Sequence, residues 1–132
     1  MSGTSLDVVR RFSEALRDKN TDQARNLLHD DLVVHEAGGL PYSGDYRGRQ
    51  GFVDLLATMN ECLELTPGPI VRDVLSDDMI VSRFRLTFTA RASGRTTEMS
   101  LVELYRVSDG LIVELDVYYK DPSAVTALLA PG

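Results

Sequence analysis

Cysteine is scarce in this chain, because Cys62 is the only one. A single thiol can form neither an internal disulfide nor a cysteine-based metal cluster. Histidine is nearly as scarce: His29 and His35 are the only two, and they lack the His-x-His or His-x-x-x-His spacing of a ligand pair. These shortages disfavour a metal site, and neither G-x-G-x-x-G nor a P-loop pattern occurs. The sequence therefore predicts no cofactor.

The chain also lacks a net positive charge, a basic stripe and long apolar runs. The 132 residues carry a formal charge of −6, and Arg10-Arg11 is the only adjacent basic pair. Nucleic-acid phosphates attract basic stripes, so a nucleic-acid partner is disfavoured. No apolar run approaches the roughly 20 residues of a membrane span, and no export leader is recognisable. We therefore expect a cytoplasmic protein with no membrane partner.

Three helices are predicted in the first half of the chain. Apolar residues recur at helical spacing between Leu6 and Leu16. Thr21 is expected to cap a second, short helix that ends at Asp30-Asp31. A third helix is expected from Gly48 to Cys62. Its apolar stripe consists of Phe52, Leu55, Leu56 and Met59.

Strands dominate the second half, where apolar residues alternate from Ile70 onwards. The inward-facing sets of the predicted strands are Ile80, Ser82, Phe84, Leu86 and Phe88; Met99, Leu101, Glu103, Tyr105 and Val107; and Leu111, Val113, Leu115, Val117 and Tyr119. Ser108-Asp109-Gly110 indicates a hairpin, and Asp121-Pro122 opens a terminal helix. Thr66 to Pro69 is expected to form an edge or a bend, because proline donates no ladder hydrogen bond.

A short strand from Leu32 to Glu36 is expected before these. Helices followed by a run of antiparallel strands indicate an α+β fold, in one domain over residues 1–132. A curved sheet with one strongly apolar face would wrap over the three N-terminal helices as a cone, with a short C-terminal helix. Such a cone leaves a cavity where helices and sheet diverge. The Gly/Pro-rich loop from His35 to Gly48 contains two tyrosines and ionisable groups, and we expect it to line the mouth of this cavity.

This order of elements resembles the nuclear transport factor 2-like (NTF2-like) superfamily. Within it the chain is most similar to the SnoaL-like polyketide cyclase group and its ketosteroid isomerase and limonene-epoxide hydrolase relatives. The segments that carry the resemblance are Val9 to Phe12, Ala15-Leu16, Asp31 to Glu36, Leu40 to Gly44, Tyr46 to Gly48, and Asp109 to Leu115. The resemblance implies a cone-shaped pocket for an apolar small molecule and a homodimer formed through the outer face of the sheet.

Site residues follow from the resemblance position by position. Glu36 stands where ketosteroid isomerase has its general base, and Glu103 stands where that enzyme has a protonated acid in its oxyanion hole. Phe12 replaces the essential helix-one tyrosine of the isomerase. Arg83-Phe84-Arg85 replaces the Arg-x-Asp triplet of the epoxide hydrolases. Glu114, one of the late-strand acids nearest to that of the SnoaL cyclase, alternates away from the apolar face unless a β-bulge re-aims it.

Strand alternation and the apolar neighbours, considered without the resemblance, also favour functional roles for Glu36 and Glu103. Alternation with Leu32 and Val34 turns Glu36 inward, where burial would raise its pKa towards the range of a general base. Glu103 lies among apolar residues, so it must be paired or neutral. The alternatives are a strand-end carboxylate that caps a backbone N–H for Glu36 and, for Glu103, a salt bridge with an arginine that reaches into the cavity.

The candidate residues fall into two groups. The catalytic candidates are Glu36, Glu103, Tyr46 and His35, although His35 alternates away from Glu36. The ligand-binding candidates are Tyr42, Phe12, Phe84, Tyr105, Tyr119, Leu101 and Met59. Arg83 and Arg85 are interpreted as outward-facing partners in cross-strand ion pairs or dimer contacts.

The leading hypothesis is a small cofactor-independent enzyme: a cyclase, an isomerase or an epoxide-opening hydrolase. It would act by general acid/base chemistry on an apolar oxygenated molecule such as a polyketide or terpenoid intermediate. One alternative is a module of the same fold that binds a hydrophobic ligand or a partner without catalysis. Another is a dimeric structural domain with a vestigial pocket.

Overall fold

A computed structural model describes residues 4–131, which form one curved sheet and four helices. The helices are α1 (Ser5–Arg17), α2 (Thr21–Asn26), α3 (Gly48–Cys62) and α4 (Pro122–Leu129). The strands are β1 (Leu28–Glu36), β2 (Gly44–Arg47), β3 (Leu63–Pro67), β4 (Val71–Ser76), β5 (Met79–Ala90), β6 (Thr96–Ser108) and β7 (Leu111–Tyr119).

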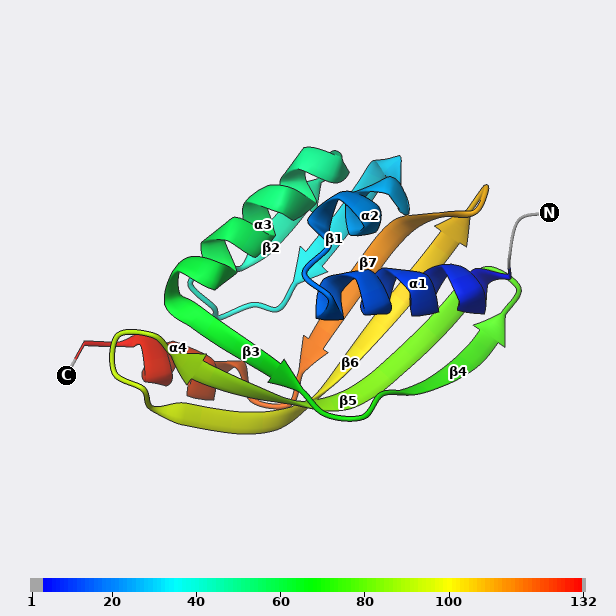
Figure 1. The fold of residues 1–132 in the computed structure, drawn as a ribbon. Helices are drawn as coiled ribbons and strands as arrows, with labels where there is room; N and C mark the ends of the chain where they lie inside the picture. Colours follow the sequence, from blue (N-terminus) through cyan, green and yellow to red (C-terminus); the bar gives the residue numbers. More distant parts are fainter. Residues whose placement is uncertain (1–3, 132) are drawn as a thin grey trace.

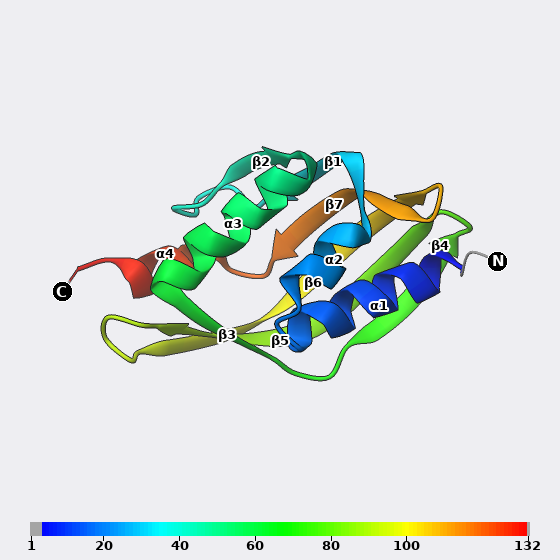
Figure 2. The same cartoon turned by 45° about the horizontal axis from the view of Figure 1, so that its top comes forward.

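The sheet has the strand order β2-β1-β7-β6-β5-β3, and β4 also pairs with β5. Strands β1 and β7 are parallel, whereas the other described pairs are antiparallel. Helices α1, α2 and α3 cover one face of the sheet, and α4 lies near the β5–β6 hairpin (Figure 1). The tilted view shows α2 between α1 and α3 above the strands (Figure 2). The predicted α+β arrangement of a curved sheet over three N-terminal helices is confirmed.

Local chemistry explains where the helices begin. Thr4 caps α1 by accepting a hydrogen bond from the Asp7 N–H at 3.2 Å, and the Asp7 carboxylate accepts one from the Thr4 N–H at 3.4 Å. This reciprocal pair satisfies two N–H groups that the first helical turn leaves without partners. Helix α3 has the predicted bounds, Gly48–Cys62. Gly48 has a φ of +74°, which a glycine adopts without the steric penalty of a side chain.

Helix α2 differs from the prediction at both ends. Asn20, not Thr21, is the cap, because the Asn20 side-chain oxygen accepts a hydrogen bond from the Gln23 N–H at 3.1 Å. The helix ends at Asn26 instead of Asp30-Asp31, and β1 begins at Leu28. Pairing of Leu28 with Ile112 of β7 draws this segment into the sheet.

Two strands were not predicted as such. β2 lies inside the segment that was expected to be an irregular loop, and Tyr46 pairs there with Val34 of β1. β3 runs into the Thr66–Pro69 segment as an edge strand and ends at Pro67, which is consistent with the expected edge or bend.

A β-bulge breaks the predicted alternation of the last strand. Arg106 pairs with Glu114 and Val107 pairs with Ile112, so Val113 is an extra residue in β7. Ile112 is consequently buried, with 0% of its surface exposed, although strict alternation turned it outward. Glu114 stays on the outer face, so the bulge re-aims Ile112 and not the acid.

The core lies between the concave face of the sheet and the three N-terminal helices. Phe12 of α1 is fully buried, and its ring centroid lies 5.4 Å from that of Phe52 and 6.1 Å from that of Tyr105. These aromatic contacts join α1, α3 and β6 into one packed layer. None of the helices among residues 4–131 is long and apolar enough to cross a membrane.

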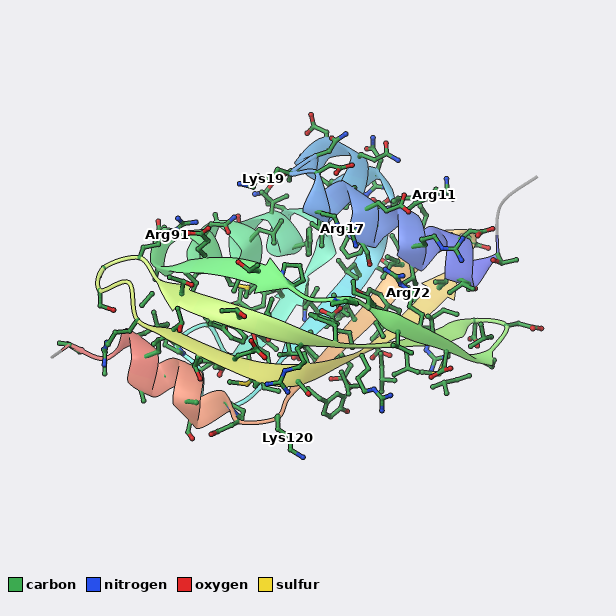
Figure 3. All side chains as sticks on the ribbon, turned by 60° about the horizontal axis from the view of Figure 1, so that its bottom comes forward. Arg11, Arg17, Lys19, Arg72, Arg91 and Lys120 are labelled. Atoms are coloured by element: carbon green, nitrogen blue, oxygen red, sulfur yellow. The ribbon has the colours of Figure 1, made fainter. Side chains whose placement is uncertain are left out.

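Replacing Phe12 with alanine is expected to lower the free energy of unfolding by about 3–5 kcal/mol, because it leaves a cavity at the junction of α1, α3 and β6. Urea unfolding measures the change. Arg11→Ala is the matched control, because Arg11 is exposed on the same helix (Figure 3) and its loss should change stability by less than about 0.5 kcal/mol. Equal effects of the two substitutions would contradict this description of the core.

Candidate active site

One transverse row of the sheet carries polar residues on the concave face, under the helices. Ser82 of β5 pairs with Glu103 of β6, and Arg72 of β4 pairs with Ser82 from the other side. Residues paired across a ladder point to the same face, so these three side chains lie next to one another. Glu103 also pairs with Val117 of β7. His35 of β1 is opposite Asp116, so Glu36 lies beside Val117 and extends the row.

The helices cover this part of the concave face incompletely. Glu36, Glu103, Phe84 and Tyr119 face the helices but retain partial solvent exposure. Leu101, on the same strand as Glu103, is only 3% exposed. The two acids of the row are therefore partly accessible and lie among buried apolar side chains, which is the composition of many small-molecule sites.

The Glu36 carboxyl group is a strongly perturbed acid. Its pKa is raised from 4.5 to about 7. Burial is the largest cause and the nearby charge of Glu103 adds to it, while the Tyr119 hydroxyl and the Ala37 N–H, which is 3.4 Å from the carboxylate, partly offset the rise. Desolvation penalises the charged carboxylate more than the neutral acid. At neutral pH this group can therefore both accept and donate a proton.

Three tyrosines surround Glu36. The Tyr42 and Tyr119 hydroxyl oxygens are 2.9 Å apart, and the Tyr46 hydroxyl donates to the Tyr42 carbonyl oxygen at 2.8 Å. Burial raises the pKa of Tyr42 and Tyr119, so both hydroxyls stay protonated. A hydrogen bond between two hydroxyls uses one of their two protons, and the other is free to be donated. The Tyr119 proton can thus be directed at Glu36.

Glu103, the second acid of the row, is hydrogen-bonded to the hydroxyl group of Tyr105. The Tyr105 hydroxyl donates to Glu103 Oε1 at 2.8 Å, and it also interacts with Ser13 of α1. Burial raises the pKa of Glu103, while the Tyr105 hydroxyl and the positive charge of Arg72 oppose that rise. An arginine therefore reaches towards Glu103, as the salt-bridge alternative expected, but Arg72 forms no ion pair within 4.0 Å among residues 4–131.

His35 lies on the opposite, outer face of the sheet. Its Nδ1 is 2.8 Å from Asp45 Oδ1, and its Nε2 is 3.1 Å from Glu114 Oε2. The hydrogen bond to Asp45 raises the pKa of His35, and the Glu114 hydrogen bond adds to the rise, while partial burial opposes it. These contacts tie β2, β1 and β7 together and direct the imidazole away from Glu36.

The outer face also contains the expected cross-strand ion pair. Arg85 Nε of β5 is 2.6 Å from Glu98 Oε1 of β6, and this contact lowers the pKa of Glu98. Carboxyl groups on the two faces of one sheet thus have pKa values shifted in opposite directions.

Several candidate ligand contacts lie in the packed core. Phe12, Tyr42, Leu101, Tyr105 and Met59 are each no more than 8% exposed. Phe84 and Tyr119 are the candidates that retain partial exposure, and the two rings of Tyr119 and Phe88 lie 5.7 Å apart.

Two polar residues of the row, Arg72 and Ser82, were not among the sequence candidates. Alternation predicts Ser82 on the inward face of β5, and a polar residue on that apolar face could have indicated a site residue. Arg72 belongs to a strand whose pattern is weak, because most of β4 is exposed.

Two hollows lie near α4, away from this row. The larger has a volume of about 690 Å³ and is mainly apolar. Its lining comprises Pro41, Glu61, Cys62, Ala90, Ala92, Ser93, Arg95, Leu128, Leu129, Ala130 and Pro131. The smaller, of about 590 Å³, lies between α4 and residues 94–97. Neither hollow is lined by Glu36 or Glu103. Among the described residues, no group of three or more His, Cys, Asp or Glu side chains could hold a metal ion.

Comparisons with known proteins agree on the architecture. Residues 9–115 match the family described as SnoaL-like domain. An NTF2-like protein from Burkholderia xenovorans LB400 superposes with a TM-score of 0.87 at 19% identity, over 98% of this chain and 100% of that one. A protein from Pseudomonas putida KT2440, described as a "putative polyketide cyclase", gives a TM-score of 0.84 at 18% identity over 97% and 99%.

A further solved structure, TerC co-crystallised with polyporic acid, gives a TM-score of 0.80 at 18% identity, over 95% of this chain and 97% of that one. A search of curated proteins finds none that matches significantly. Identities this low establish the NTF2-like fold alone, because one scaffold can host unrelated activities.

The raised pKa of Glu36 predicts how stability depends on pH. Between pH 4.5 and about 7 the unfolded chain gives up the Glu36 proton while the folded chain keeps it, so folding loses stability as pH rises. Glu36→Gln removes this loss. The free energy of unfolding of the variant, minus that of the wild type, should increase by up to about 3 kcal/mol from pH 4.5 to pH 8 in urea titrations.

Glu98→Gln provides the control with the opposite sign. The pKa of Glu98 is lowered, so its stabilising contribution is present at neutral pH and is lost as pH falls. A pH-independent difference between Glu36→Gln and the wild type would show that Glu36 titrates like an exposed carboxyl group.

Proposed function

Because this chain belongs to the family of SnoaL-like domains, we propose that it is a small enzyme, independent of cofactors, that catalyses proton transfer on an apolar oxygenated molecule. The observation that carries the proposal is the position of Glu36, a carboxyl group with a pKa of about 7 in the same row as Glu103. A general base is most effective when its pKa is close to the working pH. Two acids in different environments can divide the roles of base and acid between them.

In the proposed reaction, Glu36 removes a proton from a carbon next to a substrate carbonyl. The C–H bond breaks, the proton moves to a Glu36 oxygen, and the electron pair passes to the carbonyl oxygen as an enolate. Glu103 in its protonated form donates a hydrogen bond to that oxygen. Where a C=C bond is conjugated with the enolate, the proton returns from Glu36 to a more distant carbon, which is isomerisation. Alternatively, the enolate carbon attacks a second carbonyl of the same molecule and the resulting alkoxide takes the proton from Glu36, which is cyclisation.

The rate enhancements expected from the base and from the oxyanion donor can be compared with typical values. A positioned base supplies about 10²–10⁴-fold in rate, and one hydrogen-bond donor to a developing oxyanion about 10²–10³-fold. Tyr119 and Tyr42 orient the Glu36 carboxylate through their hydroxyl pair. The Tyr46 hydroxyl donates to a backbone carbonyl, so it serves to hold the segment that carries Tyr42.

The substrate class follows from the apolar surroundings of the row. Phe84 and Tyr119 flank the acids, retain partial exposure and would contact a planar or cyclic hydrocarbon body. The polyporic acid in the TerC crystals and the cyclase description of another neighbour support this substrate class. A polyketide-like molecule with a carbonyl and an acidic C–H bond fits both requirements.

A non-catalytic ligand-binding module is the second candidate. The observation in its favour is the packing of Phe12, which is 0% exposed and offers no hydroxyl at the place where ketosteroid isomerases have their tyrosine. The Tyr105 hydroxyl next to Glu103 supplies a phenol from β6 instead, which keeps the enzyme the better supported of the two.

Glu36→Gln tests the enzyme proposal. With a substrate identified from a panel of polyketide-like ketones, kcat should fall about 10²–10⁴-fold while the affinity for substrate changes little, because the amide keeps the shape but cannot accept the proton. Glu98→Gln, on the outer face, should keep wild-type kcat. Loss of affinity with unchanged kcat would support the binding module instead.

We also propose that two copies of the chain associate through the outer face of the sheet. Tyr118 is 52% exposed there, and Val102, its partner in register, is half-buried beside Arg83. Leu104 and Val81 continue the apolar strip along the next row. Ile112, which alternation had assigned to this face, is buried in the core and does not contribute.

Light scattering at micromolar concentration should give the mass of a dimer. Val102→Asp should convert it to a monomer, because it places a charge in the centre of the strip. Val74→Asp is the control, since Val74 is 58% exposed and pairs with Ile80 on the other face. A wild-type mass of one chain would contradict the proposed association.

A further inference from the structure

Two polar atoms in the row have no partner in the structure. Arg72 Nε and Ser82 Oγ are both buried and form no hydrogen bond with any residue between 4 and 131. Ser82 as a whole is 1% exposed, and apart from two tyrosines it is the only residue with a polar side chain among the buried residues of the described chain. Buried hydrogen-bonding groups are almost always satisfied, so two unsatisfied atoms on paired residues require an explanation.

The surrounding residues do not supply the missing partner. The carboxylate nearest along the row is Glu103, and it accepts from the Tyr105 hydroxyl without coming within 4.0 Å of Arg72. Figure 3 shows Arg72 on the side of β4 that faces α1, not with the arginines and lysines that extend from the surface. A guanidinium group held in this way, with one buried N–H unpaired, is stabilised by an anionic acceptor.

The geometry suits one kind of acceptor. A guanidinium presents parallel N–H groups that match the two oxygens of a carboxylate, and the neighbouring serine hydroxyl adds one more donor. An apolar surface adjoins the pair, because Phe84 follows Ser82 by two residues on the same face and pairs with Leu101. The site therefore combines anion-binding donors with a wall for a hydrocarbon ring.

We propose that Arg72 and Ser82 form a subsite that binds the carboxylate of an apolar acid and thereby orients it in the active site. This assignment rests on the proposed function, which it narrows to substrates or products with a free carboxylate. Three strand spacings separate Ser82 on β5 from Glu36 on β1, and each spacing is about 4.8 Å. The ligand is accordingly an elongated molecule, with its carboxylate near Arg72, its carbonyl near Glu103 and its acidic C–H bond near Glu36.

Binding of two matched probes tests the subsite without a known substrate. The probes are 2-naphthoate and 2-naphthamide, which share a shape and differ in charge. Each is titrated into the ¹⁵N-labelled protein at pH 8, and the Arg Nε–H signals are recorded. The Arg72 signal is assigned from its loss in Arg72→Lys.

The expected result is that 2-naphthoate shifts the Arg72 Nε–H signal and binds at least about tenfold more tightly than the amide, as a charge-assisted hydrogen bond requires. In Arg72→Met the two probes should bind equally. Ser82→Ala, a smaller change, should weaken naphthoate binding several-fold and leave amide binding unchanged. Arg83→Met is the control, because Arg83 is exposed on the outer face of β5, and it should keep the full preference.

Two outcomes overturn the subsite. Equal affinity of the wild type for both probes, or an undiminished preference in Arg72→Met, would show that Arg72 does not bind the carboxylate, and would leave the role of Glu36 intact. Binding of neither probe would show that the row does not admit an aromatic ligand, and would remove the basis of the proposed function as well.

Discussion

The carboxyl groups of Glu36 and Glu103 lie on the sheet face that α1 to α3 cover, where each loses much of its contact with water. Desolvation raises the pKa of both acids, and their proximity makes a second negative charge costly. Tyr119 and Tyr105 each supply a phenol to one of the acids, which limits the rise without removing it. The proposed base, the proposed oxyanion donor and the proposed carboxylate subsite all depend on this one condition, namely burial that is incomplete enough to admit a ligand.

On the opposite face of the same strands, carboxyl groups are more exposed and form ion pairs. Glu98 and Glu114 are bound there by Arg85, His35 and Arg106 in ion pairs of 2.6–3.7 Å. The pKa of Glu98 is lowered, the reverse of what burial does to Glu36. Because side chains alternate along a strand, adjacent residues such as His35 and Glu36 belong to these two environments. One sheet thus separates a face with ion pairs, where we propose association, from a face with desolvated acids, where we propose catalysis.

Most of the fold could be predicted from the sequence, because strong periodicity marks the elements that bury most apolar surface. Helix α3 and the hairpin at Asp109-Gly110 are examples. The failures have physical causes. Asn20 and Thr21 are both good caps, so composition could not choose between them. The segment that forms β2 is rich in residues typical of loops, and only its pairing with β1 makes it a strand. The bulge at Val113 depends on how β7 fits β6, which alternation within one strand cannot reveal.

The candidate site was predictable in part for the same reason. Alternation placed Glu36 and Glu103 on the concave face, and it separated His35 from them. Neither the proximity of Tyr119 to Tyr42 nor the alignment of Arg72 with Ser82 could be predicted, because both arise from pairing and packing between segments distant in the chain.

Desolvation of the Glu36 carboxyl group is the central claim, and one measurement addresses it most directly. The pKa of Glu36 can be determined from its carboxyl ¹³C shift as a function of pH, in the wild type and in Glu103→Gln. The wild type should titrate near 7, and the variant should still titrate well above 4.5, because desolvation is the largest cause of the rise and Glu103 contributes least. A Glu36 that titrates near 4.5 in either protein would contradict the account.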